Sequence, residues 1–186
     1  MSGRENHSEA ALIQQAIDGS RAAFGKLVNP HTARLISLAG RMLGGSDQAE
    51  DAVQDSLASV WLARDRLDPQ RPVGPFLTTV VLNKCRDRLR KRKAARLFGL
   101  DSSTETFSVA DDSPDPEEIA AQRDALRHLT AEIGRLPIRL REALVLVTMD
   151  DRSQAEAAAL LGVSEKTVET RIYRARKRLK ERMKDS

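Results

Sequence analysis

Residues 153–179 read SQAEAAALLGVSEKTVETRIYRARKRL and predict two short helices joined by a tight turn. Ser153, followed three residues later by Glu156, forms a capping box that begins the first helix. Gly162 ends that helix in a left-handed turn, and Ser164 caps the second helix. Two helices joined in this way through a glycine predict a helix-turn-helix.

The second of these helices carries a polar and mostly basic face. Such a face fits the major groove of DNA, where side chains read base edges while arginines contact phosphates. The exposed positions are expected at Glu165, Lys166, Glu169, Thr170, Tyr173, Arg174 and Lys177, with Arg171, Arg176 and Arg178 available to phosphates. The pattern favours DNA binding over a purely structural helical hairpin.

Charge is separated along the chain rather than mixed. Residues 84–96 hold eight Lys or Arg against one acid, and residues 166–180 hold seven against one. Between them, residues 101–118 hold seven acids and no base, together with two prolines and four serines, which is the composition of a linker. We therefore predict an N-terminal helical bundle at 8–96, an acidic flexible linker at 97–121 and a C-terminal helix-turn-helix domain at 122–184.

Composition limits the fold and the chemistry. The chain has 186 residues, of which 40% are apolar, 31% charged and 3% aromatic, so we expect an all-α protein. Cys85 is the sole cysteine, and with three histidines it cannot supply a structural zinc cluster, so we expect no metal and no cofactor. The sequence shows no phosphate-cradling glycine loop and no nucleophile beside a base, which argues against an enzyme.

Hydropathy predicts a cytoplasmic protein without membrane insertion. No apolar run approaches the length that spans a bilayer. The opening residues MSGRENHSEA lack the apolar core of a signal peptide.

The N-terminal half shows helical periodicity in successive stretches. Residues 11–28 form two short helices around a turn at 18–20, and a further helical stretch covers 31–43. In the next helix Trp61 lies on the apolar stripe and is expected in the core. The opposite face of that helix is suited to docking on a partner protein and carries Asp51, Gln54, Asp55 and Ala58.

After a proline-rich loop, a helix is predicted from Phe76 onward. Leu77, Val81, Cys85 and Leu89 recur every four residues and define its buried stripe, so Cys85 is interpreted as a core residue. The opposite stripe can lie against a nucleic-acid backbone while its amide reads a base edge. That stripe contains Asn83, Arg86, Asp87, Arg90 and Lys93.

Three segments, in this order and spacing, resemble parts of one known family. They are SDQAEDAVQDSLASVW (46–61), FLTTVVLNKCRDRLRKRK (76–93) and LPIRLREALVLVTMDDRSQAEAAALLGVSEKTVETRIYRARKRL (136–179). They look like regions 2.2, 2.3–2.4 and 4 of bacterial RNA polymerase sigma factors, in the short extracytoplasmic-function (ECF) class of the sigma-70 family. The resemblance implies a protein that binds core RNA polymerase, recognises the −10 and −35 promoter elements, assists strand opening and is controlled by an anti-sigma protein.

The resemblance also implies roles for individual residues. The expected partners in core polymerase are the β′ clamp helices and the β subunit. The face that would dock on the clamp helices consists of Asp51, Gln54, Asp55 and Ala58. Asn83 is expected to bind a flipped base of the −10 element, with Asp87 and Arg90 beside it. The phosphates of that element are expected to contact Lys84, Arg88 and Arg92. The −35 element is expected to contact Lys166, Glu169, Thr170, Arg171, Tyr173, Arg174 and Lys177.

Two positions depart from the family pattern. Phe76 stands where many members have Trp, so it is either a stacking residue or part of the core. Glu169 stands in the recognition helix where an arginine is frequent; its carboxylate can accept a hydrogen bond from a cytosine amino group but repels phosphate. We therefore expect a −35 sequence different from that of arginine-bearing members.

Two other functions fit part of the sequence. A stand-alone regulator would bind DNA with its C-terminal domain and use the N-terminal bundle to dimerise or to sense a ligand, but this leaves Asn83 and the basic residues 84–93 without a role. A sigma-like decoy would only sequester an anti-sigma protein and would need neither basic face.

Overall fold

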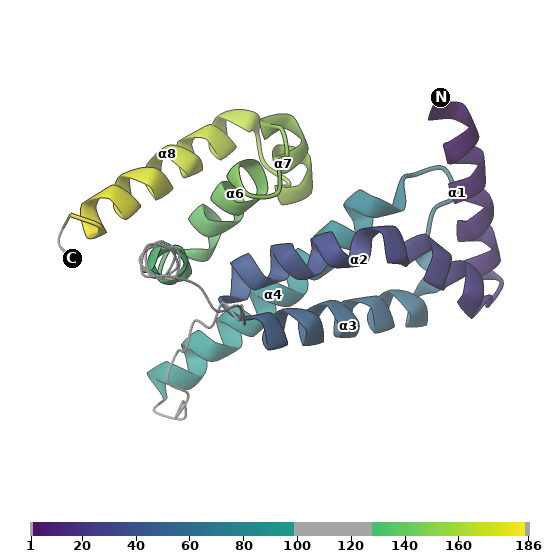
Figure 1. Cartoon of the computed structure of the whole chain (residues 1–186), viewed down its shortest axis with the longest axis horizontal. Coiled ribbons are helices and arrows are strands. Elements are labelled where there is room, and N and C mark those ends of the chain that lie inside the picture. Colours follow the sequence, from purple (N-terminus) through teal and green to yellow (C-terminus); the bar gives the residue numbers. More distant parts are fainter. Residues whose placement is uncertain (1, 99–127, 185–186) are drawn as a thin grey trace, which may run out of the picture.

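The computed structural model describes the backbone of residues 2–98 and 128–184, and in these two ranges every regular element is a helix. The all-α prediction is confirmed. Residues 99–121 of the predicted linker lie outside the described residues. In chain order the elements are α1 (Ser2–Ile17), α2 (Arg21–Leu43), α3 (Ser46–Leu62), the 3-10 turn η1 (Arg64–Arg66), α4 (Val73–Leu97), helical residues 128–134, α6 (Ile138–Thr148), α7 (Gln154–Leu161) and α8 (Glu165–Arg182) (Figure 1).

The N-terminal half is a bundle in which α2, α3 and α4 pack along one another. α1 crosses the end of the bundle that lies away from α8 (Figure 1). Leu38 and Met42 of α2, Val53 of α3 and Val81 of α4 are fully buried in its centre. Burial of one such side chain stabilises the fold by about 1.5–3 kcal/mol.

α2 runs without a break through Pro30, whereas the sequence predicted separate stretches that end at residue 28 and resume at 31. Proline has no N–H to donate to the carbonyl of Lys26, which is why a break was expected. Val28 and Leu35, on either side of Pro30, are both buried, and this packing keeps the helix continuous. The predicted turn at 18–20 is confirmed, and the Ser20 hydroxyl caps α2 by accepting from the Ala23 N–H at 3.2 Å.

α4 begins at Val73, three residues before the predicted start at Phe76. Pro75 lies in its first turn, where a proline removes no helical hydrogen bond because the first N–H groups have no partner within the helix. One of those groups is satisfied from outside: the Val73 N–H donates to Glu9 Oε1 of α1 at 2.9 Å. A carboxylate on another helix thus provides the cap that Pro72 cannot.

The helix-turn-helix is formed by α7 and α8 as predicted. Ser153 and Glu156 make the complete capping box, and the Ser164 hydroxyl accepts from the Thr167 N–H at 3.2 Å. Gly162 has φ 64°, in the left-handed region where a side chain is disfavoured. Leu146 of α6 is fully buried, and α6 lies against both α7 and α8.

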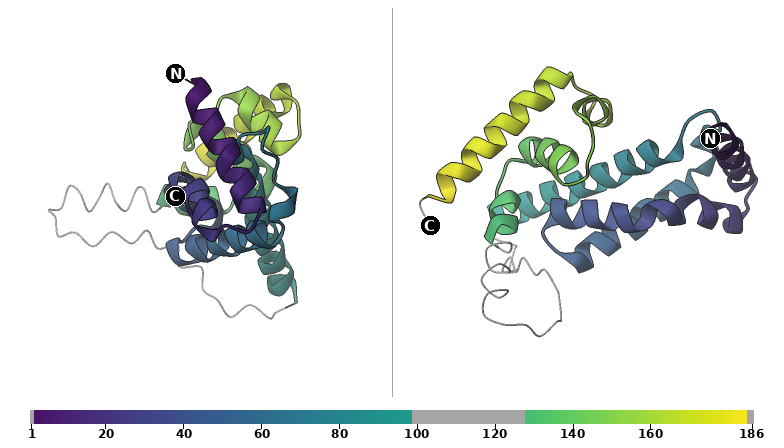
Figure 2. Two further views of the ribbon diagram at one scale, coloured as in Figure 1. Left: turned by 90° about the vertical axis from the view of Figure 1, so that its right-hand side faces the viewer. Right: turned by 45° about the horizontal axis from the view of Figure 1, so that its top comes forward.

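The two halves touch each other. α6 packs against α2, and α7 packs against α4, so that α6 lies between the bundle and α8 (Figure 2). This contact joins residues more than one hundred positions apart, such as Arg34 and Asp150.

Candidate polymerase and nucleic-acid interfaces

The exposed face predicted on α3 is present. Asp51, Gln54, Asp55 and Ala58 all point to solvent on one side of the helix, while Ala52 and Val53 are buried on the other. This packing holds the backbone of α3 in place. The exposed surface therefore presents two carboxylates and an amide at fixed positions, and the small side chain of Ala58 leaves space beside them.

Asp55 links this surface to α4. Its Oδ2 atom lies 2.9 Å from Arg88 Nη2 and 3.3 Å from Lys84 Nζ. The hydrogen bond from Arg88 and the Lys84 ammonium hold the pKa of Asp55 below its ordinary value. The structure therefore brings together residues that the sequence assigned to two separate binding sites.

Two polar faces run along α4, and the predicted −10 residues divide between them. Lys84, Arg88 and Arg92 recur every four residues on the side that faces α3. Arg88 Nη1 donates to the Gln48 carbonyl at 2.9 Å, and Arg92 Nη1 donates to the Leu43 carbonyl at the end of α2 at 3.2 Å. Arg88 and Arg92 thus hold the end of α2 and the start of α3, while Lys84 contacts Asp55 further along α3.

The second polar face of α4 contains Asn83, Asp87 and Arg90. Asn83 and Asp87 are exposed, and Asp87 pairs with Arg90 at 3.5 Å. The amide oxygen of Asn83 accepts a hydrogen bond from Arg86 Nη1 at 2.7 Å. Arg86 is in turn paired through two nitrogens with the carboxylate of Glu142 on α6. In this structure the predicted base-reading amide is therefore connected to the C-terminal half.

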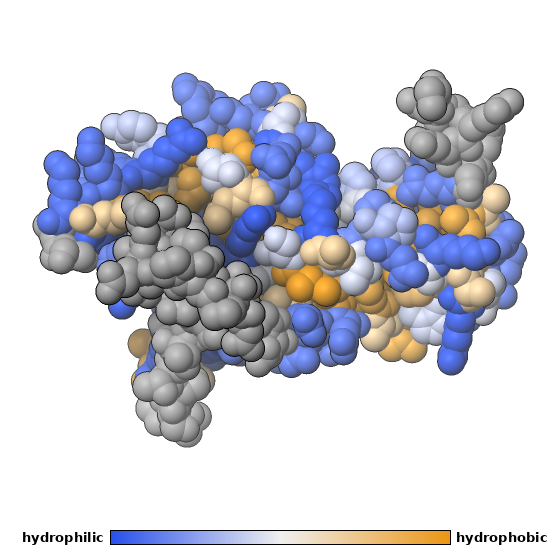
Figure 3. Space-filling model, viewed as in Figure 1, coloured by the Kyte–Doolittle hydropathy of each residue, from blue (hydrophilic) through white to orange (hydrophobic). Residues whose placement is uncertain are grey.

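The recognition helix α8 presents its predicted residues outward. Val168 and Ile172 are buried, whereas Tyr173 is 69% exposed. Lys166 Nζ pairs with Glu169 at 2.8 Å within the helix. Hydrophilic side chains cover the outer side of α8 in Figure 3. The remaining predicted −35 positions are exposed at Arg174 and Lys177 and half-buried at Thr170 and Arg171.

Phe76 is not a core residue, because 41% of its surface is exposed. Its ring lines a hollow of about 420 Å³ together with Ala159 and Leu160 of α7. Of the two interpretations of Phe76, the core position is therefore wrong: Leu77 occupies the buried stripe of α4, and the adjacent Phe76 lies on the side of the helix that faces α7.

Cys85 lies in the core as predicted, whereas Trp61, also expected there, lies at the edge of the core. Trp61 is half-buried, with its ring 5.3 Å from that of Phe24 and the Arg64 guanidinium 4.9 Å above it. Cys85 is fully buried, and this burial raises the pKa of its thiol to about 12. A thiol with so high a pKa is inert at neutral pH.

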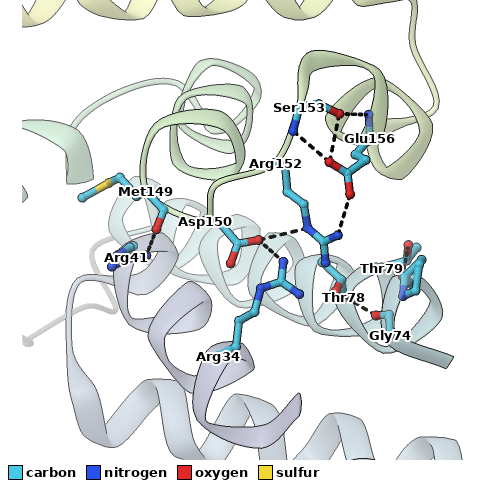
Figure 4. A network of polar contacts seen from close by, with 11 residues as sticks. Arg34, Arg41, Gly74, Thr78, Thr79, Met149, Asp150, Arg152, Ser153 and Glu156 are labelled. Atoms are coloured by element: carbon cyan, nitrogen blue, oxygen red, sulfur yellow. Dashed lines mark hydrogen bonds and ion pairs between the residues drawn. The ribbon is translucent and has the colours of Figure 1, made fainter. Parts of the chain in front are cut away.

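The sequence analysis missed a network of polar contacts between the two halves (Figure 4). Arg34 of α2 pairs with Asp150, which also lies 3.6 Å from Arg152. Arg152 continues to Glu156 of the capping box at 2.9 Å. One signal was available: Arg141 and Glu142 interrupt the otherwise apolar run of residues 140–147.

Within residues 9–45, 48–98 and 128–184, no cluster of three or more His, Cys, Asp or Glu side chains is arranged to hold a metal ion. None of the helices that the structure describes has both the length and the apolar character of a membrane span.

Comparison with known proteins identifies the family. Residues 27–95 match the model of sigma-70 region 2, and residues 126–179 match that of sigma-70 region 4. Over 176 residues the chain is 38% identical to the RNA polymerase sigma factor CnrH of Cupriavidus metallidurans, with 92% of each chain covered. It is 36% identical to the ECF RNA polymerase sigma factor SigM of Mycobacterium tuberculosis, with 95% of this chain and 85% of SigM covered. The chain belongs to the ECF class of sigma factors.

Solved structures agree with this assignment. The sigma factor resembles CnrH in its complex with the cytosolic domain of CnrY, with a TM-score of 0.67 and 34% identity over 96% of this chain and 99% of that one. It also resembles the sigma factor RpoE of Bartonella quintana in complex with the anti-sigma factor NepR, with a TM-score of 0.65, 26% identity and coverage of 87% and 96%. As a sigma factor, the protein directs core RNA polymerase to promoters.

Proposed function

We propose that this sigma factor divides promoter recognition between two helices, with α8 reading the −35 element as duplex and α4 reading the −10 element as an opened strand. The observation that carries the proposal is the order of two structural elements along the chain. A polar helix suited to single-strand contact is followed by a capped helix-turn-helix with an outward basic helix.

The geometry of α8 fits the major groove. Val168, Ile172 and Ala175 anchor one side of the helix in the C-terminal core. The opposite side presents Tyr173 and Arg174, whose side chains can contact base edges. Glu169 would select cytosine at its position, while the neighbouring cations contact phosphates.

On α4, the proposed reader of a flipped base is Asn83. An amide has both donors and an acceptor, so it can pair with a base edge that has left the stack. Flipping one base costs only a few kcal/mol, which contacts elsewhere in the polymerase complex can offset. Asp87 and Arg90 lie on the same polar face and would border that base.

The proposed polymerase contact is the exposed face of α3. Asp51, Gln54 and Asp55 offer acceptors to cations on the clamp helices of the β′ subunit, and Ala58 leaves room for a partner side chain. We expect the protein to work in the cytoplasm beside the polymerase, in a role that needs no chemistry from the chain itself. Control by an anti-sigma protein is part of the proposal, because RpoE, which it resembles, was solved with the anti-sigma factor NepR.

Run-off transcription tests this function. Purified core polymerase is incubated with fragments of the host genome, with and without the protein, and new transcripts are mapped. We expect discrete start sites preceded by a shared pair of elements. Binding to duplex DNA without initiation would favour the stand-alone regulator, and neither activity would favour the decoy.

Matched substitutions assign the surfaces. Asp51→Arg should prevent initiation by blocking polymerase binding, while Glu50→Arg, at an adjacent exposed position of α3, should not. Asn83→Ala should reduce initiation without weakening polymerase binding, whereas Asn29→Ala, at an exposed asparagine of α2, should leave both unchanged. If the two substitutions of a pair had equal effects on initiation, the surface that the pair tests would not have the proposed role.

A further inference from the structure

The contact between the two halves centres on carboxylates of the C-terminal half that are buried against arginines of the N-terminal half. The side chain of Glu142 is only 3% exposed, and both of its oxygens accept from Arg86. A two-nitrogen pair of this kind is among the strongest polar contacts in proteins because its geometry is fixed as well as its charge.

Asp150 makes a second contact of the same type. Its side chain is also 3% exposed, and it pairs with Arg34 of α2 and with Arg152 (Figure 4). Arg152 contacts the same carboxylate from within the C-terminal half, so Asp150 has a cationic neighbour in each half.

The helix ends add a reciprocal exchange. Arg41 of α2 donates to the Met149 carbonyl at the end of α6, and Arg141 of α6 donates to the Met42 carbonyl in the last turn of α2 at 2.6 Å. The last carbonyls of a helix have no partner within it and carry partial negative charge. Each half therefore places a cation on the carboxyl end of a helix from the other half.

One of these contacts, between Arg86 and Glu142, lies beside the exposed Asn83 on α4. Arg86 cannot keep its position on Glu142 and also move aside for a base, because its guanidinium holds both the Asn83 oxygen and the Glu142 carboxylate. Two promoter elements about two helical turns apart are also separated by about 70 Å along B-DNA, whereas here α7 packs directly on α4.

We infer that the C-terminal domain of the free sigma factor binds its own N-terminal bundle through Arg86 and Glu142, beside the −10-reading Asn83, and through Arg34 and Asp150, and that this contact must open before the promoter is bound. The inference rests on the function proposed for α4. No partner protein is needed for the closed form, since every contact in it comes from the chain itself.

Two properties determine how the contact responds to salt and to substitution. Arg86 and Arg34 are partly exposed, so added salt weakens their pairs, although less than it weakens pairs at the open surface. The carboxylates are buried, however, so removing the charge on one partner has a large effect. Both properties can be measured.

Electron–electron distance measurements on the full chain test the closed form. Spin labels are placed with Ala22→Cys on α2 and Lys180→Cys on α8, both exposed positions outside the proposed binding surfaces. The native Cys85 does not compete for label, because it is fully buried and its thiol pKa is about 12. We expect one narrow distance distribution at low salt and a broader, longer one at high salt. A broad distribution at low salt would overturn the inference.

Substitutions assign the contact to the named pairs. Glu142→Gln combined with Asp150→Asn should raise the ratio of open to closed molecules by about tenfold or more. Arg34→Met should act in the same direction from the other half. Glu132→Gln is the matched control, because Glu132 is an equally buried carboxylate that pairs with Arg135 and Arg182 inside the C-terminal half. If the control opens the chain as much, or the double variant leaves it closed, the inference fails.

Run-off transcription with the same variants separates this inference from the proposed function. Opening by Glu142→Gln with Asp150→Asn should increase initiation at limiting protein concentration, while Glu132→Gln should not. Variants that open in the distance measurement but initiate like the parent would overturn the inhibitory role and leave the sigma function intact. If no variant initiates, the parent included, the proposed function fails while the distances still report the contact.

Discussion

α4 and α8 carry similar basic blocks, but their side chains are engaged differently. On α8, Lys166 and Lys177 pair within the helix, with Glu169 at 2.8 Å and with Glu181 at 4.0 Å, and Arg182 at its end pairs with Glu132 of the same half. On α4 several cations reach other elements, as Arg88 reaches Asp55 of α3 and Arg86 reaches Glu142 of α6, while Arg90 pairs within the helix. Sequence composition alone does not distinguish these two situations.

The difference follows from position in the fold. α8 is covered on one side only, whereas α4 lies between α3 and the C-terminal half. Exposed ion pairs within a helix contribute about 0–1 kcal/mol to stability, so a DNA phosphate can readily replace the acidic partner. Breaking a pair with a buried carboxylate by removing one partner costs about 3–5 kcal/mol. We therefore expect α8 to bind DNA at once and α4 only after a rearrangement.

The largest expected effect tests whether the two halves unfold together. Leu146→Ala on α6 should lower the free energy of unfolding by about 2–5 kcal/mol, because it leaves a cavity at a fully buried site. The single tryptophan, Trp61, reports on the N-terminal half. If the halves are coupled, its fluorescence transition should shift in the same direction as the circular-dichroism transition at low salt. A Trp61 transition that does not move would contradict the coupling.

A smaller effect is expected from the exposed side of α8. Arg174→Ala should weaken binding to a promoter fragment about 10- to 100-fold, as loss of one base-reading contact does. Lys180→Ala, at an exposed basic position of the same helix outside the predicted reading face, should lower affinity far less. Fluorescence anisotropy at a fixed salt concentration measures both. Equal losses would mean that α8 contributes charge but reads no sequence.

Glu169 tests the reading itself rather than its strength. Glu169→Arg should change the preferred base at one −35 position, because an arginine favours guanine where a carboxylate accepts from cytosine. Promoter selection from a randomised pool provides the measurement. If the preferred sequence stays the same, Glu169 does not face a base.

The smallest effect concerns the capping box of α7. Hydrogen bonds from the Ser153 N–H and hydroxyl and from Arg152 lower the pKa of Glu156 to about 2. Because the folded pKa lies below the ordinary value of 4.5, the carboxylate stabilises α7 above pH 4.5 and loses this contribution as the pH falls toward 2. An NMR titration of the Glu156 carboxyl group should therefore have its midpoint near pH 2, and a midpoint near 4.5 would show that the cap does not form.

Local signals predicted the local structure well. Ser153, Glu156 and Gly162 predicted the helix-turn-helix because caps and left-handed turns depend on nearby residues only. Pro30 gave a false signal, since buried neighbours outweigh one lost hydrogen bond. The start of α4 was misplaced because its cap comes from Glu9, sixty-four positions away.

The contact between the halves was beyond such reasoning. Arg86 and Glu142 are each ordinary charged residues in the sequence, and only the packing of α6 and α7 on the bundle brings them together. The same holds for Asp55, which was assigned to the polymerase surface while its contacts with Lys84 and Arg88 join that surface to the proposed DNA surface. Long-range charge pairing depends on the relative placement of helices, which periodicity does not reveal.

The central claim is that α4 and α8 contact different promoter elements. Photo-crosslinking in the complex with polymerase and promoter tests this claim most directly. A photoreactive side chain is introduced at Tyr173 on α8 or at Arg90 on α4, both exposed, and the crosslinked bases are mapped. We predict that position 173 labels duplex bases of the −35 element and that position 90 labels the opened strand of the −10 element, about two helical turns away. Crosslinks from both positions to one element, or from neither, would contradict the account.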